Sequence, residues 1–223
     1  MSTYLNSIIW LIAAVFISFS VSMIFSGLIK LSRRVFLIPY ITISSAFLFA
    51  FFCFNFTDLK ELLTTHWLWG LIAGIIAGAF LVSNVFSQPN SRTSKGWNLL
   101  FDIVWMGLAY GIIDALLLNV IPVLIIWETV SSIGWIETWA GKIMIGSFAL
   151  VASLLITFVY HMGYTEFRNK KMLLVLFGNS LITLAFIVSG NPLGAIISHT
   201  AMHIAAVIRG PETTIQLPPH GNN

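Results

Sequence analysis

The chain has 223 residues, of which 58% are hydrophobic and only 9% are charged. An average soluble domain carries about 25% charged residues, so this composition excludes a soluble enzyme, a secreted disulfide scaffold and a disordered chain. The formal charge of +3 comes from short basic clusters between apolar runs, which are typical of membrane topology and not of nucleic-acid binding. We therefore expect an all-α, integral membrane protein in the lipid bilayer.

Seven apolar stretches approach the length of about 20 residues that a helix needs to cross the hydrocarbon core. The fourth continues past Pro122 toward Trp127, which predicts a helix that is long, kinked or broken there. We expect a single transmembrane helical domain over residues 1–208 and a short cytoplasmic tail over 209–223. The predicted spans cover residues 7–29, 35–56, 67–86, 97–121, 142–162, 172–190 and 192–208.

Basic residues alternate along the chain between the segments that connect these spans. Nine of the 11 Lys and Arg residues follow the first, third, fifth and seventh spans, whereas Lys60 and Lys142 share their segments with acidic residues. Positively charged loops stay in the cytoplasm, so the pattern predicts an outside N-terminus and a cytoplasmic C-terminus. The nine residues are Lys30, Arg33, Arg34, Arg92, Lys95, Arg168, Lys170, Lys171 and Arg209.

Small residues at four-residue spacing mark faces on which membrane helices pack closely. One such row lies in the third span and another in the fourth, where Asp114 falls about 20° around the helix from the row. Asp114 is therefore expected to face the interior of the bundle. The two rows consist of Gly70, Gly74 and Gly78, and of Gly107 and Gly111.

Histidines lie on similar stripes of the fifth and seventh spans. His161 ends a row of small polar residues in the fifth span, and His199 and His203 lie four residues apart in the seventh. Ionisable groups inside a membrane are costly, which makes them functional candidates. At about 1.5 Å per residue, Asp114 falls roughly 6 Å outward of the midplane and His161 roughly 14 Å inward. These groups meet only if the fourth span shifts or tilts inward.

Two histidines at this spacing can bind one metal ion together. The stretch His199-Thr200-Ala201-Met202-His203 lacks the glutamate of soluble zinc peptidases, but His161 and Asp114 would complete a tetrahedral set for a divalent metal such as zinc. A carboxylate and a histidine can instead activate water directly while other imidazoles stabilise an oxyanion. A third interpretation is that these residues only fasten the helices by hydrogen bonds. The residues alone leave all three open.

The second half of the chain, about 97–208, resembles the CAAX prenyl protease and bacteriocin-processing (CPBP) family of intramembrane peptidases. That family carries a Glu-Glu-x-x-x-Arg motif, a Phe-x-x-x-His motif and a His-x-x-x-Asn motif on successive or later spans. The sequence departs from it at Asp114-Ala115 in place of the glutamate pair, at Asn119 in place of the arginine and at His203 in place of the asparagine. The matching stretches are Gly111 to Asn119, Thr157 to His161 and Asn191 to His203.

The resemblance implies an intramembrane hydrolase that cleaves a peptide bond of a membrane-associated peptide or protein. Carried over position by position, the catalytic residues are Asp114, His161, His199 and His203, which are also the ligands of any bound metal. A different interpretation is a catalytically inactive membrane scaffold or partner subunit of the same fold, which the substitutions Ala115 and Asn119 favour. A proton or metal transporter that uses the same cluster is a third.

Overall fold

The computed structural model describes residues 3–55, 59–130, 137–212 and 214–219. Within these ranges all regular structure is helical and no strand occurs, which confirms the expected all-α fold. The α-helices are α1 (Thr3–Val21), α2 (Arg33–Asn55), α3 (Leu59–Thr64), α4 (Trp67–Ser87), α5 (Gly96–Asp102), α6 (Tyr110–Ala115), α7 (Ile121–Val130), α8 (Trp139–Met162), α9 (Lys171–Ser189) and α10 (Leu193–Arg209).

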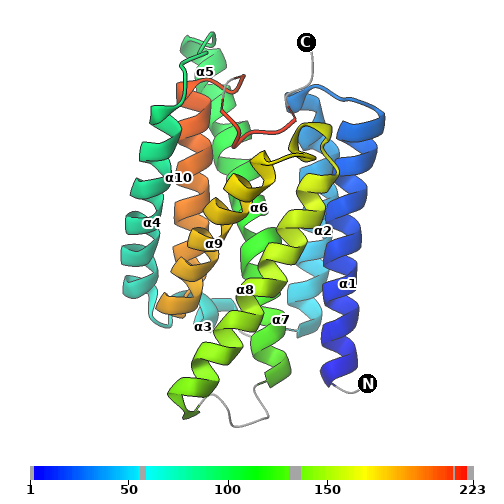
Figure 1. Ribbon diagram of the computed structural model, residues 1–223, viewed down its shortest axis with the longest axis vertical. Helices are drawn as coiled ribbons and strands as arrows, with labels where there is room; N and C mark the ends of the chain where they lie inside the picture. The colour runs from blue at the N-terminus through cyan, green and yellow to red at the C-terminus, as the bar shows by residue number, and fades with distance from the viewer. Residues whose placement is uncertain (1–2, 56–58, 131–136, 213, 220–223) are drawn as a thin grey trace.

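Among the described residues, six helices are long and apolar enough to cross a membrane, and the shorter apolar helix α10 makes seven. This number agrees with the predicted spans. Helix α1 begins at one end of the bundle and α10 ends at the other, as an odd number of crossings requires (Figure 1). The protein is therefore a multi-pass integral membrane protein.

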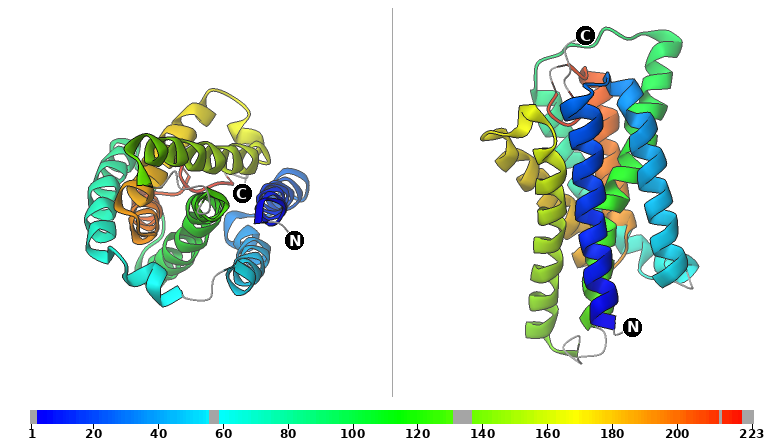
Figure 2. Two further views of the ribbon diagram at one scale, coloured as in Figure 1. Left: turned by 90° about the horizontal axis from the view of Figure 1, so that it is seen from below. Right: turned by 90° about the vertical axis from the view of Figure 1, so that its right-hand side faces the viewer.

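The fourth span is one continuous helical rod from Gly96 to Val130, comprising α5, α6 and α7. Its most apolar window is 72% buried, against 22–39% in the other long spans, because the other helices surround it (Figure 2). Two π-helical turns, Ile103–Ala109 and Leu116–Val120, interrupt its α-helical geometry on either side of α6. Pro122 follows the second of these turns and does not break the rod. Of the alternatives predicted at this proline, the long helix is the one observed.

Helix α10 lies between α4 and α6, and both predicted glycine rows contact it. A Cβ atom added to Gly78 of α4 would lie 3.3 Å from the Cα of Ser198. A Cβ added to Gly111 of α6 would lie only 2.9 Å from the Cα of Thr200. The glycines therefore allow a close approach of the backbones, which a side chain at Gly111 would force apart and one at Gly78 would crowd.

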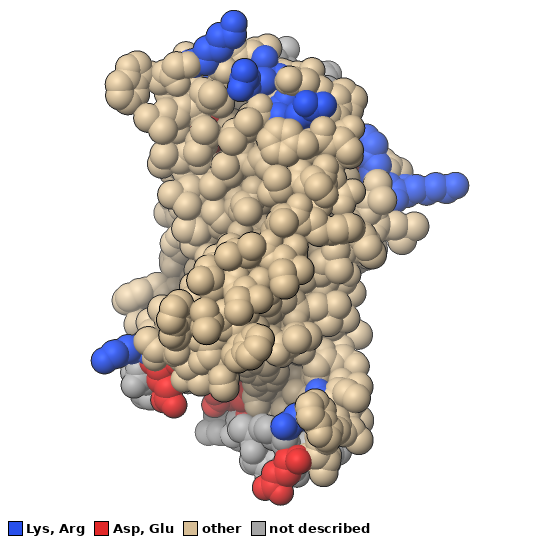
Figure 3. All heavy atoms as spheres, turned by 90° about the vertical axis from the view of Figure 1, so that its left-hand side faces the viewer, with Lys and Arg blue, Asp and Glu red and all other residues tan. Residues whose placement is uncertain are grey.

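The two ends of the bundle differ in their charged side chains. Lys and Arg side chains gather at the end where α10 terminates, and acidic side chains appear at the opposite end (Figure 3). At the basic end, Arg34 donates two hydrogen bonds of 2.8 Å to the buried carboxylate of Asp102, and Ser94 donates another of 2.8 Å. Asp102 thus joins the start of α2 to α5 and is separate from the site described below.

The segment after α10 folds back across the basic end. Arg33 Nε donates to the carbonyl oxygen of Leu217 at 2.6 Å, and Gln88 Nε2 donates to Gln216 Oε1 at 3.0 Å. Leu217 and Thr214 are fully buried. The described part of the predicted tail therefore packs against the bundle, while residues 213 and 220–223 lie outside the described residues.

Candidate functional site

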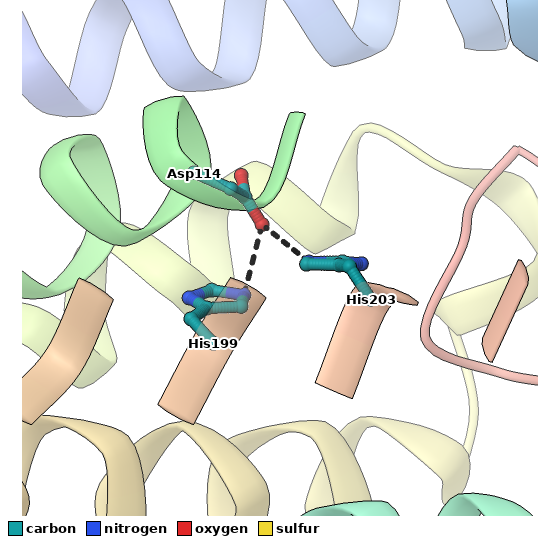
Figure 4. Close-up of side chains that lie close together, drawn as sticks. All are labelled: Asp114, His199 and His203. Carbon is teal, nitrogen blue, oxygen red and sulfur yellow. Dashed lines mark ion pairs between the residues drawn. The ribbon is translucent and has the colours of Figure 1, made fainter. Parts of the chain in front are cut away.

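Asp114 of α6 meets both histidines of α10 in the interior of the bundle (Figure 4). Asp114 Oδ2 lies 3.3 Å from His199 Nε2 and 3.6 Å from His203 Nε2. The two imidazole rings stack with centroids 4.8 Å apart and planes inclined by 15°. All three residues are at most 3% exposed, so the carboxylate and the two rings are buried inside the bundle. Asp114 of the fourth predicted span and both histidines of the seventh therefore meet in the structure.

The carboxylate of Asp114 is held from two sides. The hydroxyl group of Tyr40 in α2 donates a hydrogen bond of 2.5 Å to Asp114 Oδ1, and the other carboxylate oxygen, Oδ2, faces the histidines. Gly111, one helical turn before Asp114, lies close to Thr200 of α10, so α6 packs tightly against α10 beside Asp114. The position of Asp114 is therefore fixed by a hydrogen bond and by backbone packing together.

Asn119 orients His199 through a network that links four helices. Its Nδ2 donates to Asn179 Oδ1 at 2.9 Å and to Thr183 Oγ1 at 2.8 Å, so both amide hydrogens are used. The remaining atom, Oδ1, lies 3.0 Å from His199 Nδ1 and can only accept. His199 therefore carries its proton on Nδ1 and turns the lone pair of Nε2 toward Asp114 when the ring is neutral. Ser153 of α8 completes the network by contacting Thr183 at 2.8 Å.

His203 has no such support. Both of its ring nitrogens are buried without a hydrogen-bond partner among the described residues, and the 3.6 Å approach to Asp114 is too long for a hydrogen bond. A buried polar group left unpaired costs about 1–3 kcal/mol. The ring of Tyr110 packs on it at a centroid distance of 4.7 Å and offers no bond to its nitrogens. Either ring nitrogen of His203 could therefore bind a ligand.

A cavity of about 380 Å³ lies next to the three residues. Its inner wall includes Asp114 and His203, and its outer wall includes Phe80 of α4 with Leu174 and Phe177 of α9, which are 48–61% exposed. The cavity therefore extends from the outer surface between α4 and α9 to the buried carboxylate. Ile215 and Gln216 of the C-terminal segment line it at the basic end.

His161 lines the same cavity but is not part of the three-residue group. Its Nδ1 lies 2.9 Å from the carbonyl oxygen of Thr157, one turn earlier in α8, and must donate there. Its ring packs edge-on against Tyr160 and Phe167. The structure thus brings together three of the four predicted site residues and places the fourth on another wall of the cavity.

Tyr40, Asn179 and Thr183 belong to the site and were not found by sequence reasoning. Asn179 and Thr183 lie four residues apart in the sixth span, which is the same polar spacing that singled out the fifth and seventh spans. That signal was present in the sequence. For Tyr40, beside Pro39 in an apolar helix, no sequence pattern indicates a partner 74 residues away.

No protein-family model, curated protein or solved structure matches this chain. Fold and site together define a polytopic helical membrane protein with a buried Asp-His-His cluster beside a cavity that reaches the outer surface.

Proposed function

We propose that this protein is an intramembrane hydrolase of the CPBP type that cleaves a peptide bond in a membrane-associated peptide or protein. The observation that carries the proposal is the carboxylate of Asp114, which faces His199 and His203 on the wall of a cavity that reaches the lipid-facing surface. A carboxylate and imidazoles are the groups that activate water for hydrolysis. A substrate anchored in the bilayer has access to them between α4 and α9.

The same three residues suit a divalent metal such as zinc. Their ligand atoms all lie within 4.8 Å of one another, with the carboxylate oxygen 3.3 and 3.6 Å from the two imidazole nitrogens, and carboxylate oxygen and imidazole nitrogen are both ligands of zinc. Asn119 accepts the Nδ1 proton of His199, as the partners of metal-bound histidines do. The unpartnered nitrogens of His203 complete the donor set. When bound, zinc lowers the pKa of its water ligand toward about 7 and supplies hydroxide at neutral pH.

The residues of the chain have separable roles in this proposal. Tyr40 and Asn119 hold Asp114 and His199 in place, because they occupy the atoms that do not face the cavity. His161 has its proton on Nδ1, so its Nε2 is free to accept a proton from the attacking water and return it to the leaving amine. We also propose that the N-terminus lies outside and the C-terminus in the cytoplasm, which a reporter fused to the C-terminus tests.

The test compares membranes of an expression host that carries the wild-type protein or the variant His199→Ala. New protein N-termini are labelled and mapped, and a synthetic peptide that spans a mapped site is then offered to purified protein in liposomes. Zinc content is measured on the same preparations. We expect wild-type protein to cleave the peptide and to hold about one zinc per chain, and His199→Ala to do neither while it still shows a cooperative melting transition. Identical N-termini in the two membranes would refute the proposal.

His66→Asn is the matched control. His66 is an exposed histidine outside the cluster, and its left-handed backbone (φ 57°) is one that asparagine accepts. This variant should retain both cleavage and zinc. If its zinc content falls as far as that of His199→Ala, the metal is bound at the surface and the cluster is not the site.

An inactive scaffold is the second candidate, and Asn119 favours it. Each polar atom of its side chain is used in bonds between helices, which is what a purely structural network requires. Under this alternative the wild-type protein neither cleaves nor binds zinc, and His199→Ala only lowers the melting temperature. The same preparations therefore separate the two candidates.

A further inference from the structure

Three buried tyrosines have their hydroxyl groups joined in a row that ends at Tyr110, a residue that lines the cavity. Tyr164, which follows α8, donates to Tyr160 Oη at 2.5 Å, and Tyr160 Oη lies 2.9 Å from Tyr110 Oη. All three are at most 1% exposed. Burial raises the pKa of the Tyr164 phenol well above its ordinary value, so this end of the line stays protonated. None of these hydroxyls has a role in the reaction as described above.

Counting hydrogens shows which hydroxyl is free to bind a ligand. Each phenol has one hydrogen, so three phenols joined by two hydrogen bonds have one hydrogen left over. Tyr164 uses its hydrogen on Tyr160. Tyr160 does not line the cavity, whereas Tyr110 does, so the arrangement that leaves no buried hydrogen unpaired has Tyr160 donating to Tyr110. The remaining hydrogen then belongs to Tyr110, on the wall that also holds Asp114 and His203.

We propose that Tyr110 is a further catalytic residue, a hydrogen-bond donor to the carbonyl oxygen of the scissile peptide bond, and that Tyr160 and Tyr164 are positioning residues. This proposal rests on the proposed function. Water oxygen bonds to the carbonyl carbon, the π electron pair moves to the carbonyl oxygen, and the resulting oxyanion accepts the Tyr110 hydrogen bond. When the C–N bond breaks, its electron pair stays on nitrogen, which takes up the proton removed from water, and the C=O bond re-forms.

The surroundings of Tyr110 suit this role. Its ring is clamped between His203 at a centroid distance of 4.7 Å and Tyr40 at 5.2 Å, so the hydroxyl is held in place before substrate arrives. A donor fixed in a dry site stabilises developing negative charge without reorganisation. The two hydroxyls behind it polarise it further, because hydrogen bonds in a chain strengthen one another.

The test uses Tyr110→Phe, which keeps the ring and removes only the hydroxyl. The probes are the peptide found in the cleavage experiment and a phosphonamidate of the same sequence, whose tetrahedral P–O⁻ group imitates the oxyanion. We expect kcat to fall about 100- to 1,000-fold with KM unchanged, and phosphonamidate binding to weaken by a similar factor. Tyr164→Phe, at the far end of the line, should lower kcat only about two- to fourfold.

Tyr4→Phe, at an exposed position on α1, is the control and should change nothing. Melting temperatures identify any variant that has lost its fold. For such a variant, folded protein is selected by size-exclusion chromatography, and phosphonamidate binding to Tyr110→Phe and Tyr110→Leu is compared with binding to wild-type protein. If wild-type protein and Tyr110→Phe cleave the peptide equally fast, the proposed role of Tyr110 is wrong and the proposed function still stands. A wild-type protein that cleaves nothing overturns both.

Discussion

Replacing Asn119 by leucine removes the polar atoms of one side chain from the site and keeps the number and branching of its heavy atoms. The substitution deletes three hydrogen bonds at a fully buried position: two donated by Nδ2, to Asn179 and Thr183, and one that Oδ1 accepts from His199. Hydrogen bonds between membrane helices contribute about 0.6 kcal/mol each on average, so the free energy of unfolding should fall by about 2 kcal/mol. Without Asn119, the proton of the neutral His199 ring is no longer held on Nδ1 and can lie on either ring nitrogen.

Ser153→Ala is a matched control for this variant. Ser153 also makes three hydrogen bonds in the same network, with Leu118, Thr183 and Asn179, and does not touch His199. We therefore expect the two variants to lose similar amounts of stability in chemical unfolding in detergent. Only Asn119→Leu should weaken zinc binding, by about 10- to 100-fold in a chelator competition, because only it removes the partner of a ligand.

Nitrogen NMR of labelled histidine gives a readout that stability does not affect. In wild-type protein the His199 ring should show a protonated Nδ1, and in Asn119→Leu a mixture of tautomers. If Asn119→Leu and Ser153→Ala bind zinc with the same affinity, the idea that Asn119 positions His199 is wrong and the network only joins helices.

Three other variants test separate parts of the structure. Gly111→Ala should destabilise the protein by about 1–3 kcal/mol, because its Cβ would lie 2.9 Å from Thr200 Cα. The control Gly178→Ala should be tolerated, because its Cβ would lie 3.8 Å from the nearest atom. Equal melting temperatures of the two variants would contradict this packing. His203→Asn should abolish zinc binding and cleavage, whereas wild-type cleavage in this variant would favour direct activation of water. Arg33→Met removes the bonds to Leu217 and Glu212, so limited proteolysis of the C-terminal segment should become faster than in Lys30→Met; identical rates would count against this anchoring.

Apolar length predicted the spans because the bilayer imposes one dimension on every crossing helix. The glycine rows likewise predicted which faces pack, since close approach of two backbones has a local signature in the sequence. Partners from distant spans were harder to predict. The contacts of Tyr40 with Asp114 and of Asn119 with Asn179 depend on how helices rotate against one another, which no single span determines.

The depth of Asp114 shows the same limit in a single helix. Counted at regular α-helical rise, it falls outward of the histidines, yet it contacts both His199 and His203. Two π-helical turns, Ile103–Ala109 and Leu116–Val120, flank the α6 segment that contains it. Such turns place an extra residue in the helix and often occur at functional sites. A constant rise per residue, assumed along the whole span, cannot predict where these π-helical turns lie.

The shorter side chain of Asp114 fits a site that is narrower than one built for glutamate. Oδ1 is bound to Tyr40 at 2.5 Å, Oδ2 is 3.3 Å from His199, and the backbone at Gly111 is already in contact with Thr200. One more methylene displaces the carboxylate by about 1 Å or more, and an error of that size costs about 100-fold in catalysis. Asp114→Glu should therefore lose zinc and cleavage nearly as completely as Asp114→Asn, which keeps the length and removes the charge. A glutamate variant that matches or exceeds wild-type cleavage would instead show that Tyr40 and Gly111 do not set the reach of the carboxylate.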